Sequence, residues 1–496
     1  MLASAVLCAP SSAFRSKGDV CAQLTDGEFE ENPILDTEVK HMKTKTLFAS
    51  TIVALNLLFA ASVPVAAVPT TWYIATGGND SNPCTQALPC RSINHVASKT
   101  NPLAQPGDTV SVAPGTYDEN NSAFGAIVTY ASGTSYTSMI TYKSQVRWGA
   151  VIIQADNSTS HPSAWTNYGN YVVIDGFDFA GKPVASPSLA GVNGVALAGA
   201  DGSTECVSSP SPCGHHSILR NSRVHGFVPD VCNGTGGSGV NVHATDIQII
   251  ANVIYGNGPK PCQYVHGIYW KDQYGLVAEN IIYGNGGHGI QEWNSSSDIT
   301  VVNNTIFSNG YSGVYVSNDR AGSDGGPTKN SNGFVDSNIV YGNGTHGIAE
   351  NCPDSCAPGS QTCCLAQASQ CPSSIGRYGN NVSYFNTLDN INLVTGSDSG
   401  STIQSDPLFI NNQLDGTGIY MGRPSLNGLT GSGNTSPALD AGLKTDTNAC
   451  GSHNHFSSLF SPYDFPAYDF SNDPTNHPRP DNGGVNFDVG AWESSY

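Results

Sequence analysis

A phrase that returns four times constrains the fold of this chain more than any other feature. Its copies read IIANVIYGNG, VAENIIYGNG, VVNNTIFSNG and VDSNIVYGNG, between residues 249 and 344. The asparagines Asn252, Asn280, Asn304 and Asn338 in these copies are 28, 24 and 34 residues apart. A step near two dozen residues with variable insertions is typical of a solenoid.

A second motif follows each copy and joins a glycine to a β-branched residue. Its copies are His266-Gly267-Ile268, His288-Gly289-Ile290, Ser312-Gly313-Val314 and His346-Gly347-Ile348. The segments between the glycines and asparagines are short, and none offers the run of 3.6-residue periodicity that a helical repeat needs. Three short strands fit into each repeat. We therefore predict an all-β solenoid, a single-stranded parallel β-helix with three strands per coil.

Asparagines at one position of successive coils can hydrogen-bond through their side-chain amides to the coils above and below, as in the ladders of cross-β assemblies. We predict such a ladder from one residue of each coil: Ser222, Asn252, Asn280, Asn304, Asn338 and Asn381. The pattern favours a structural role for these residues over a chemical one.

The composition suits one body that is rich in turns. The 496 residues include 55 glycines, and only 12% are charged. A solenoid grows in one dimension, so this length does not imply several domains. The formal net charge of −19 argues against nucleic acid and against an anionic membrane surface as partners.

The first 67 residues have the pattern of a leader. Lys43 and Lys45 precede an apolar run that ends in small residues at 65–67, which is typical of a secretory signal peptide over residues 42–67. We interpret residues 1–41 as an upstream extension that is not native. No second apolar run of 18 residues follows. We expect a secreted or periplasmic protein that is monomeric and not inserted in a membrane.

Twelve of the 14 cysteines remain after the leader, and an even number in an exported chain predicts disulfides. We expect local clamps on loops at Cys84–Cys90, Cys206–Cys213 and Cys232–Cys262. The pairing of the other six stays open: Cys352, Cys356, Cys363, Cys364, Cys371 and Cys450. A zinc cluster is the alternative, although an oxidising compartment and irregular spacing argue against it.

Distinctive segments flank the coils at both ends. The N-terminal one contains YIA, GNDSNP, PGDTV and PGTY, with a short helix expected from about Ser92 to Lys99, and the C-terminal one contains SDPLF, SPALDAG and DVGAWE. With the coils, these motifs resemble secreted bacterial right-handed parallel β-helix proteins of the pectate-lyase-like superfamily. The resemblance implies a cap at 68–126, right-handed coils at 127–400 and a closing segment at 401–496. It does not select an activity, because that superfamily contains lyases, hydrolases, epimerases and non-catalytic proteins.

Strand alternation indicates which side chains of the second motif face outward. If its aliphatic residues face the core, their outward neighbours on coils about 4.8 Å apart form one polar-aromatic stripe. Its members are His243, Tyr269, Lys271, Gln291, Trp293 and Tyr315, with His266 and His288 along its edge. Rings beside hydrogen-bonding groups suit the apolar faces and hydroxyls of sugars. The alternative is that His-Gly-Ile merely begins a strand.

A polysaccharide lyase would use Lys271, the only lysine on the stripe. β-Elimination of a uronate removes the proton α to a carboxylate, which needs a deprotonated base and a neutralised carboxylate. Calcium held by Asp272 and Glu292 is the candidate for the second task, and Arg223 on an earlier coil is a candidate carboxylate clamp. The alternatives are a solvated lysine at a strand end and a surface arginine. The paired-aspartate calcium motif of the lyase families is missing from the sequence.

An inverting glycoside hydrolase would instead use Glu292 and Glu350 as its catalytic pair, two coils or roughly 9.6 Å apart by strand spacing. Both fall at an inward position, so they must turn outward at the strand end or be hydrogen-bonded at a coil corner. A non-catalytic glycan-binding or structural surface protein is the third class. Among the three we expect a lyase that acts on a uronate-containing, pectin-like polysaccharide.

Overall fold

A computed structural model describes a set of ranges within the 496 residues. They are 68–119, 127–154, 163–182, 192–198, 214–229, 232, 237–293, 296–317, 334–351, 377–393, 397–398 and 402–407. The expected leader, the pair Cys206–Cys213, the set of six cysteines and nearly all of the closing segment lie outside them. Among the described residues, no helix is both long and apolar enough to cross a membrane.

The short β-branched segments form three parallel sheets, and each full coil contributes one strand to each sheet. The first sheet contains β1 (Thr71–Ile74), β2 (Thr109–Val112), β5 (Ile140–Ser144), β8 (Val172–Asp175), β11 (Ile218–Arg220), β14 (Ile247–Ile250), β17 (Gln273–Ala278), β20 (Ser297–Val302), β23 (Phe334–Asp336), β26 (Arg377–Gly379) and β29 (Ser397–Asp398).

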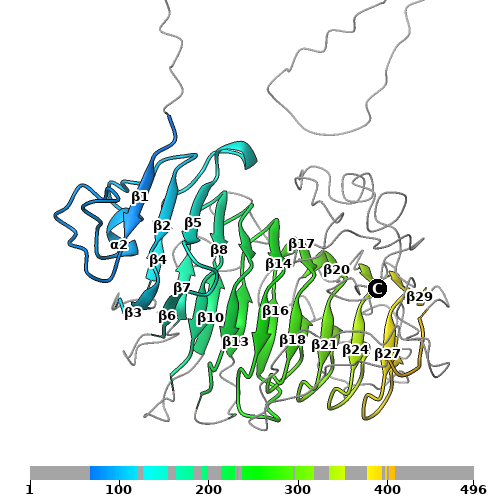
Figure 1. Cartoon of the computed structure of the whole chain (residues 1–496). Helices are drawn as coiled ribbons and strands as arrows, with labels where there is room; N and C mark the ends of the chain where they lie inside the picture. Colours follow the sequence, from blue (N-terminus) through cyan, green and yellow to red (C-terminus); the bar gives the residue numbers. More distant parts are fainter. Residues whose placement is uncertain are drawn as a thin grey trace, which may run out of the picture. The chain divides into compact units, whose positions relative to one another are not determined.

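The second sheet contains β3 (Gly115–Tyr117), β6 (Ala150–Ile153), β9 (Asp178–Ala180), β12 (Arg223–His225), β15 (Val253–Tyr255), β18 (Ile281–Tyr283), β21 (Thr305–Phe307), β24 (Ile339–Tyr341) and β27 (Val382–Tyr384). The third contains β4 (Ile127–Thr129), β7 (Ser163–Asn167), β10 (Val192–Leu197), β13 (Gly237–Val242), β16 (Val265–Trp270), β19 (Ile290–Glu292), β22 (Val314–Ser317), β25 (Ile348–Asn351) and β28 (Ile391–Asn392). Figure 1 shows the coils following one another in chain order, from blue to yellow.

The inward columns of the third sheet follow the repeated motif. Val240, Ile268, Ile290, Val314 and Ile348 pair in register across five neighbouring strands, and each is fully buried. Because side chains alternate along a strand, the residues on either side of this column face the other way. The predicted direction of the stripe residues depends on this register.

The predicted asparagine ladder is confirmed from Ser222 to Asn381. The Asn280 side chain accepts hydrogen bonds from the backbone N–H and the side-chain amide of Asn252, at 2.9 and 3.1 Å, and its own amide donates to Asn304 at 2.9 Å. The same bonds recur along the column. The ladder therefore provides hydrogen-bond partners for the buried backbone groups of the turn between the first and second sheets.

A second ladder, which we did not predict, lines the turn between the second and third sheets. Its members are Asn257, Asn285, Asn309, Asn343 and Asn386. The asparagine of the YGNG or SNG ending supplies the first four members, so the same repeated phrase carries both ladders, and Asn386 follows Tyr384-Phe385 at the equivalent turn.

The glycines of the second motif are explained by close approach of the coils. A Cβ atom on Gly267 would lie 2.5 Å from the carbonyl oxygen of Gly289, and one on Gly289 would lie 2.7 Å from that of Gly313. Contacts below 3.0 Å to backbone atoms cannot be relieved by a rotamer change. Only glycine fits between the coils at this position.

The N-terminal cap contains the expected helix in shorter form. Helix α2 (Ile93–Val96) has Ser92 as its N-cap, and the Glu119 carboxylate accepts from the backbone N–H groups of Ile93 and Asn94 at 2.8 and 3.0 Å. The predicted disulfides Cys84–Cys90 and Cys232–Cys262 are present. A single turn of 3-10 helix, η1 (Tyr136–Ser138), precedes β5.

Candidate functional site: a polar-aromatic stripe on the third sheet

The structure brings the stripe residues together on the third sheet. Tyr269 of β16 pairs with Gln291 of β19, which pairs with Tyr315 of β22. One position beyond β16 is Lys271, and one beyond β19 is Trp293, whose backbone N–H bonds to the carbonyl of Trp270 at 2.9 Å. The residues of the predicted stripe are therefore neighbours on adjacent strands of the structure.

Ring contacts join most of the stripe into one surface. The His266 ring stacks on Tyr269 and on His288, with centroids 5.7 and 5.4 Å apart. The His288 ring in turn stacks on Tyr315 at 4.3 Å. The Tyr315 ring lies 6.4 Å from that of Trp293, which extends the surface along the third sheet. His243 joins the surface through Tyr269, at 6.4 Å.

The two edge histidines are held in one tautomer by the backbone. The Nδ1 atom of His266 accepts from the backbone N–H of His288 at 3.2 Å, and the Nδ1 atom of His288 accepts from that of Ser312 at 3.1 Å. A ring nitrogen that accepts carries no proton, so the proton lies on Nε2. Each ring therefore offers an Nε2–H donor.

Burial keeps both rings neutral. It lowers the pKa of His266 to about 3, and burial together with the charges of His266 and His346 lowers the pKa of His288 well below its ordinary value. Near neutral pH the edge of the stripe consists of uncharged hydrogen-bond donors. The interpretation of His-Gly-Ile as the start of a strand and the interpretation as a binding edge both fit this geometry.

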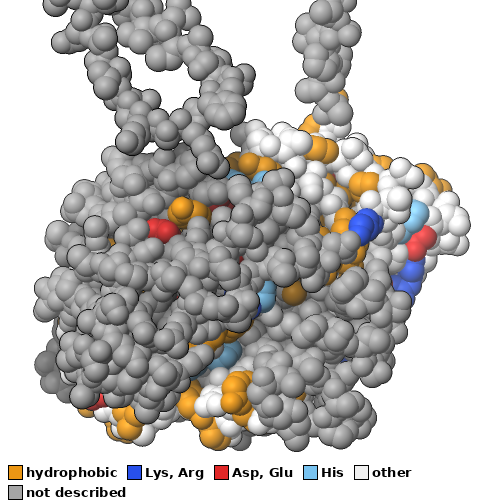
Figure 2. All heavy atoms as spheres, turned by 180° about the vertical axis from the view of Figure 1, so that it is seen from behind, with side chains coloured by type: hydrophobic (Ala, Val, Ile, Leu, Met, Phe, Trp, Pro, Cys, Tyr) orange, Lys and Arg blue, Asp and Glu red, His pale blue; other side chains and the backbone are white. Residues whose placement is uncertain are grey.

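The stripe has a buried part and an accessible part. His266, His288, Gln291 and Tyr315 keep only 4 to 7% of their surface exposed. The partly exposed residues are His243, Tyr269, Lys271 and Trp293, together with Asn241. A ligand would meet this second group first. Seen from behind, the described surface shows few Lys, Arg, Asp and Glu side chains among the hydrophobic and other side chains (Figure 2).

Lys271 occupies the centre of the accessible part. It lies in one column with His243 of the preceding coil and Trp293 of the following coil, and its backbone N–H bonds to the carbonyl of Val242 at 3.1 Å. The side chain is partly exposed. Its position agrees with the one predicted for the base of a lyase, and the role itself stays a prediction.

Glu292 and Glu350 lie inside the solenoid, which contradicts the catalytic role expected for them. Both belong to an inward column of the third sheet, in register with the core residues Trp270 and Val316. Glu292 is 0% and Glu350 4% exposed. The hydroxyl of Tyr378 donates to Glu350 at 2.7 Å. Of the two expected arrangements, Glu350 shows the hydrogen-bonded one, and neither carboxylate turns outward, so this pair does not face the outer surface of the third sheet.

The predicted calcium ligands do not fit the ion. Calcium takes six to eight oxygen ligands, whereas Asp272 is 1% and Glu292 0% exposed, both within the solenoid wall. Within the described ranges, the only group of three His, Cys, Asp or Glu ligand atoms close enough for a metal is Cys84, Cys90 and His95. Its two cysteines form a disulfide. We assign no metal to the stripe.

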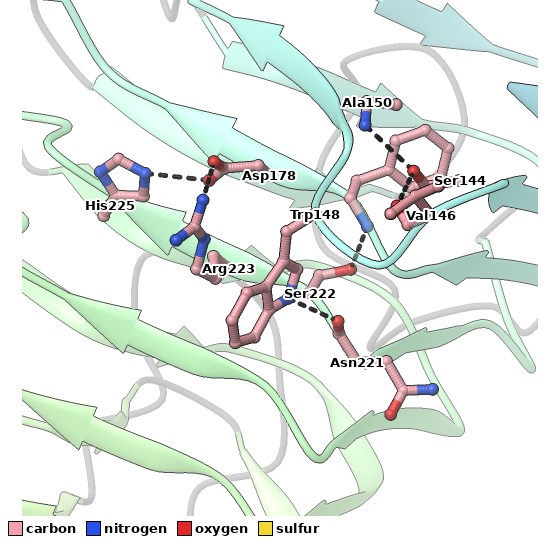
Figure 3. Close-up of polar contacts among 10 residues, drawn as sticks. Ser144, Val146, Trp148, Ala150, Asp178, Asn221, Ser222, Arg223 and His225 are labelled. Carbon is pink, nitrogen blue, oxygen red and sulfur yellow. Dashed lines mark hydrogen bonds and ion pairs between the residues drawn. The ribbon is translucent and has the colours of Figure 1, made fainter. Parts of the chain in front are cut away.

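Arg223 is the one predicted binding residue that the structure places elsewhere. It begins β12 on the second sheet, where its guanidinium pairs with Asp178 (Figure 3). His225 contacts the other oxygen of Asp178 at 2.9 Å. Arg223 therefore lies beside the asparagine ladder, as expected, but on the second sheet and away from the stripe, and its role as a carboxylate clamp stays a prediction.

Two residues beyond the predicted members lie at the stripe: Asn241, for which strand alternation predicts an outward side chain, and Tyr311, which we did not predict. Asn241 occupies the row of Tyr269 one coil earlier, and the strand alternation that identified Tyr269 also points to it. The Tyr311 ring lies 5.6 Å from that of His288. Tyr311 precedes the third copy of the second motif, and nothing in its local sequence marks it.

Comparisons with known proteins agree with this architecture. Residues 192–349 match a protein family described as "Right handed beta helix region". No curated protein matches the chain. The match spans β10 to the beginning of β25 and, with the three parallel sheets, confirms the predicted right-handed parallel β-helix.

Solved structures with similar coordinates have low sequence identity. Pectate lyase Pel9A is 16% identical, with a TM-score of 0.48, over 86% of this chain and 97% of that chain. The complex of XylC with xylose is 12% identical, with a TM-score of 0.41, over 68% of this chain and 70% of that chain. An alginate lyase from Paenibacillus sp. is 14% identical, with a TM-score of 0.33, over 68% of this chain and 97% of that chain.

Proposed function

We propose that this right-handed parallel β-helix protein binds a uronate-containing polysaccharide along the stripe of the third sheet and cleaves it by β-elimination, with Lys271 as the base. The observation that carries the proposal is the setting of Lys271. It lies on one face between the coils of His243 and Trp293, beside rings and neutral donors. The two disulfides of the described residues support the related proposal that the protein works outside the cytosol.

The stripe suits a sugar chain for two reasons. Partly exposed rings such as Tyr269 and Trp293 can contact the apolar faces of sugar rings. Asn241, Gln291 and the Nε2–H groups of the two edge histidines can hydrogen-bond hydroxyl or carboxylate oxygens. Because neutral donors carry no charge to desolvate, they bind an anionic or a neutral oxygen at modest cost.

The proposed reaction needs one base and no metal. The side-chain nitrogen of Lys271, acting as the base, removes the proton on the carbon α to the uronate carboxylate. The electron pair left on that carbon forms a double bond to the neighbouring carbon, whose bond to the glycosidic oxygen breaks. The departing oxygen takes a proton from water. Hydrogen bonds from the stripe would stabilise the negative charge that develops on the carboxylate.

The test is incubation with a panel of uronate and neutral polysaccharides, followed through ultraviolet absorbance of unsaturated uronates and through reducing ends. We expect both signals on a polyuronate. Lys271→Ala should lower the rate about 10²- to 10⁴-fold, the usual contribution of a general base. Lys99→Ala, in the cap region outside the stripe, is the matched control.

Other outcomes are equally informative. Reducing ends without ultraviolet absorbance would indicate hydrolysis, and neither signal with retained binding would indicate a glycan-binding protein. If Lys271→Ala eliminated as fast as the parent chain, the base would have to be another residue. A chelator should leave the rate unchanged, because the described residues of the stripe offer no calcium site.

A further inference from the structure

A second polar cluster lies at the corner between the first and second sheets, away from the stripe on the third. In the coils that contain β8 to β21, this corner is a tight turn such as Asn221-Ser222 between β11 and β12. One coil departs from this pattern, because residues 145–149 separate β5 from β6. The added residues place Arg147 and Trp148 outside the solenoid, and neither residue is a member of the asparagine ladder at this corner.

The Trp148 ring holds two guanidinium groups. The Cζ atoms of Arg147 and Arg223 lie 4.5 and 4.7 Å from its ring centroid. Its indole N–H donates to the carbonyl of Asn221 at 2.8 Å, across 73 residues of sequence. The Nε atom of Arg147 points to the same carbonyl at 3.4 Å. Figure 3 shows Trp148 beside Arg223 and above Asn221.

The backbone of Trp148 is held in an unfavourable conformation. Its φ is +64°, a region that bulky residues rarely occupy. A short hydrogen bond from its N–H to the carbonyl of Gly176, at 2.6 Å, holds it there. Strained residues persist where the surroundings enforce them, and they are frequent at binding sites.

The corner carries more positive charge than its acids balance. Arg220 pairs with Asp175 at 3.0 Å, and Arg223 pairs with Asp178. Burial of Asp178 opposes its ionisation, but hydrogen bonds and charge from His225 and Arg223 outweigh it and lower the pKa of Asp178. Arg223 is thereby fixed in orientation by an ionised partner.

Two further cations at this corner form no ion pair among the described residues. Arg147 is exposed and contacts the Trp148 ring and the Asn221 carbonyl. Partial burial lowers the pKa of Arg147, and the charge of Asp175 acts in the opposite direction without forming an ion pair. Lys143 is exposed and lies in register with Asp175, without an ion pair to it. In a chain of net charge −19, this local excess is unusual and would attract an anion.

We propose that Lys143, Arg147 and Arg223, arranged around Trp148, form a second binding site that holds carboxylate groups of an acidic polysaccharide. The class of polysaccharide rests on the proposed function. A guanidinium recognises a carboxylate through two parallel N–H···O bonds, which makes arginine the suitable residue for this task. Because the stripe edge is neutral, the corner would supply the electrostatic retention of the polymer that the stripe lacks.

The experiment measures binding in the Lys271→Ala background, so that cleavage cannot affect it. The probes are polygalacturonate and its fully methyl-esterified form, which has the same backbone without charge. Arg147→Gln should weaken binding of polygalacturonate about tenfold, the loss expected for one charge-assisted contact. Binding of the esterified polymer should not change. Added salt should reduce the difference between the two polymers.

Arg91→Gln is the matched control, because it removes the same charge from a partly exposed arginine that pairs with Asp118 in the cap. It should bind both polymers as the background chain does. Lys143→Gln is a second, independent variant at the corner and should also weaken binding of polygalacturonate. Equal binding by Arg147→Gln and the background chain would overturn the proposal, and so would failure of the background chain to prefer the charged polymer.

Failure of the lyase proposal can be told apart from failure of this one. A short uronate oligosaccharide that fills only the stripe should be eliminated equally by Arg147→Gln and by the parent chain with Lys271 intact. If no elimination occurs but Arg147→Gln still weakens polymer binding, only the lyase is lost. If elimination occurs and Arg147→Gln changes nothing, only the corner site is lost.

Discussion

At the scale of the residue, burial and backbone hydrogen bonds determine the tautomer and the charge of the two edge histidines. The motif His-Gly-Ile places His266 and His288 one coil apart, and each accepts a backbone N–H on Nδ1. Protonation of either Nδ1 would break that bond and put a charge in a buried site. The coils therefore fix both the tautomer and the charge.

This state predicts a pH dependence of stability. The pKa of folded His266 is about 3, below the ordinary value of roughly 6.5. Between these values the unfolded chain binds a proton that the folded chain does not, so the free energy of unfolding falls as pH falls from about 6.5 to 3. At pH 4.5 the loss from this residue is about 2 to 3 kcal/mol.

Denaturant titrations at pH 7.5 and pH 4.5 measure this loss. His266→Gln should show a smaller difference between the two pH values than the parent chain, whatever its absolute stability. Gln291→Ala, on the same stripe but without a titrating group, should keep the parent difference. A His266→Gln chain with the parent pH difference would mean that His266 is protonated in the folded state.

At the scale of the element, each turn between the first and second sheets is stabilised by a side-chain amide that hydrogen-bonds backbone groups of its own and neighbouring coils. Asn280 accepts two hydrogen bonds from Asn252, and its amide also donates to the carbonyls of Ile249 and Ala278 at 2.8 and 2.9 Å. These groups are buried, so no water can replace a lost partner. The strands on either side of the turn depend on this one residue.

Asn280→Ala should therefore lower the free energy of unfolding by about 3 kcal/mol or more, because each buried group left without a partner costs about 1 to 3 kcal/mol. Chemical denaturation monitored by circular dichroism would measure it. Asn241→Ala removes only a 3.4 Å contact with Asn193 and should change stability by less than about 0.5 kcal/mol. Equal effects of the two substitutions would contradict a structural ladder.

At the scale of the whole molecule, contacts run almost entirely between neighbouring coils. Each interior strand pairs with the strand one coil before and the strand one coil after it in its sheet. Stability in such an array is approximately a sum of coil terms and nearest-neighbour terms. Damage to one coil should then spread to its neighbours and fade with distance.

Gly289→Ala tests this expectation, since the added methyl group would meet the Gly313 carbonyl at 2.7 Å and the Ile306 side chain at 2.6 Å. Hydrogen exchange followed by mass spectrometry should show faster exchange in β16, β19 and β22. Protection in β2 and β5 should stay near the parent level. Uniform loss of protection in all coils would mean that the solenoid unfolds as one cooperative unit.

The amino-acid sequence by itself determined the coil. Repeat spacing, strand alternation and the stacked asparagines depend on near neighbours and on identical residues in adjacent coils, so the three sheets, the first ladder and the stripe could be predicted without coordinates. The same alternation predicted that Glu292 faces inward. The structure adds that Glu292 is fully buried, so its carboxylate does not face a substrate on the outer surface.

Only the tertiary structure decided which residues meet across distant segments. Trp148 reaches Asn221 over 73 residues, and no repeat links them, so the corner site could not be predicted. The sequence places Arg223 beside the ladder on an earlier coil, but only the structure shows that its guanidinium pairs with Asp178 on the second sheet. Local pattern specifies a strand and its two faces, whereas burial, tautomer and contacts between unlike coils arise only when all the coils are packed together.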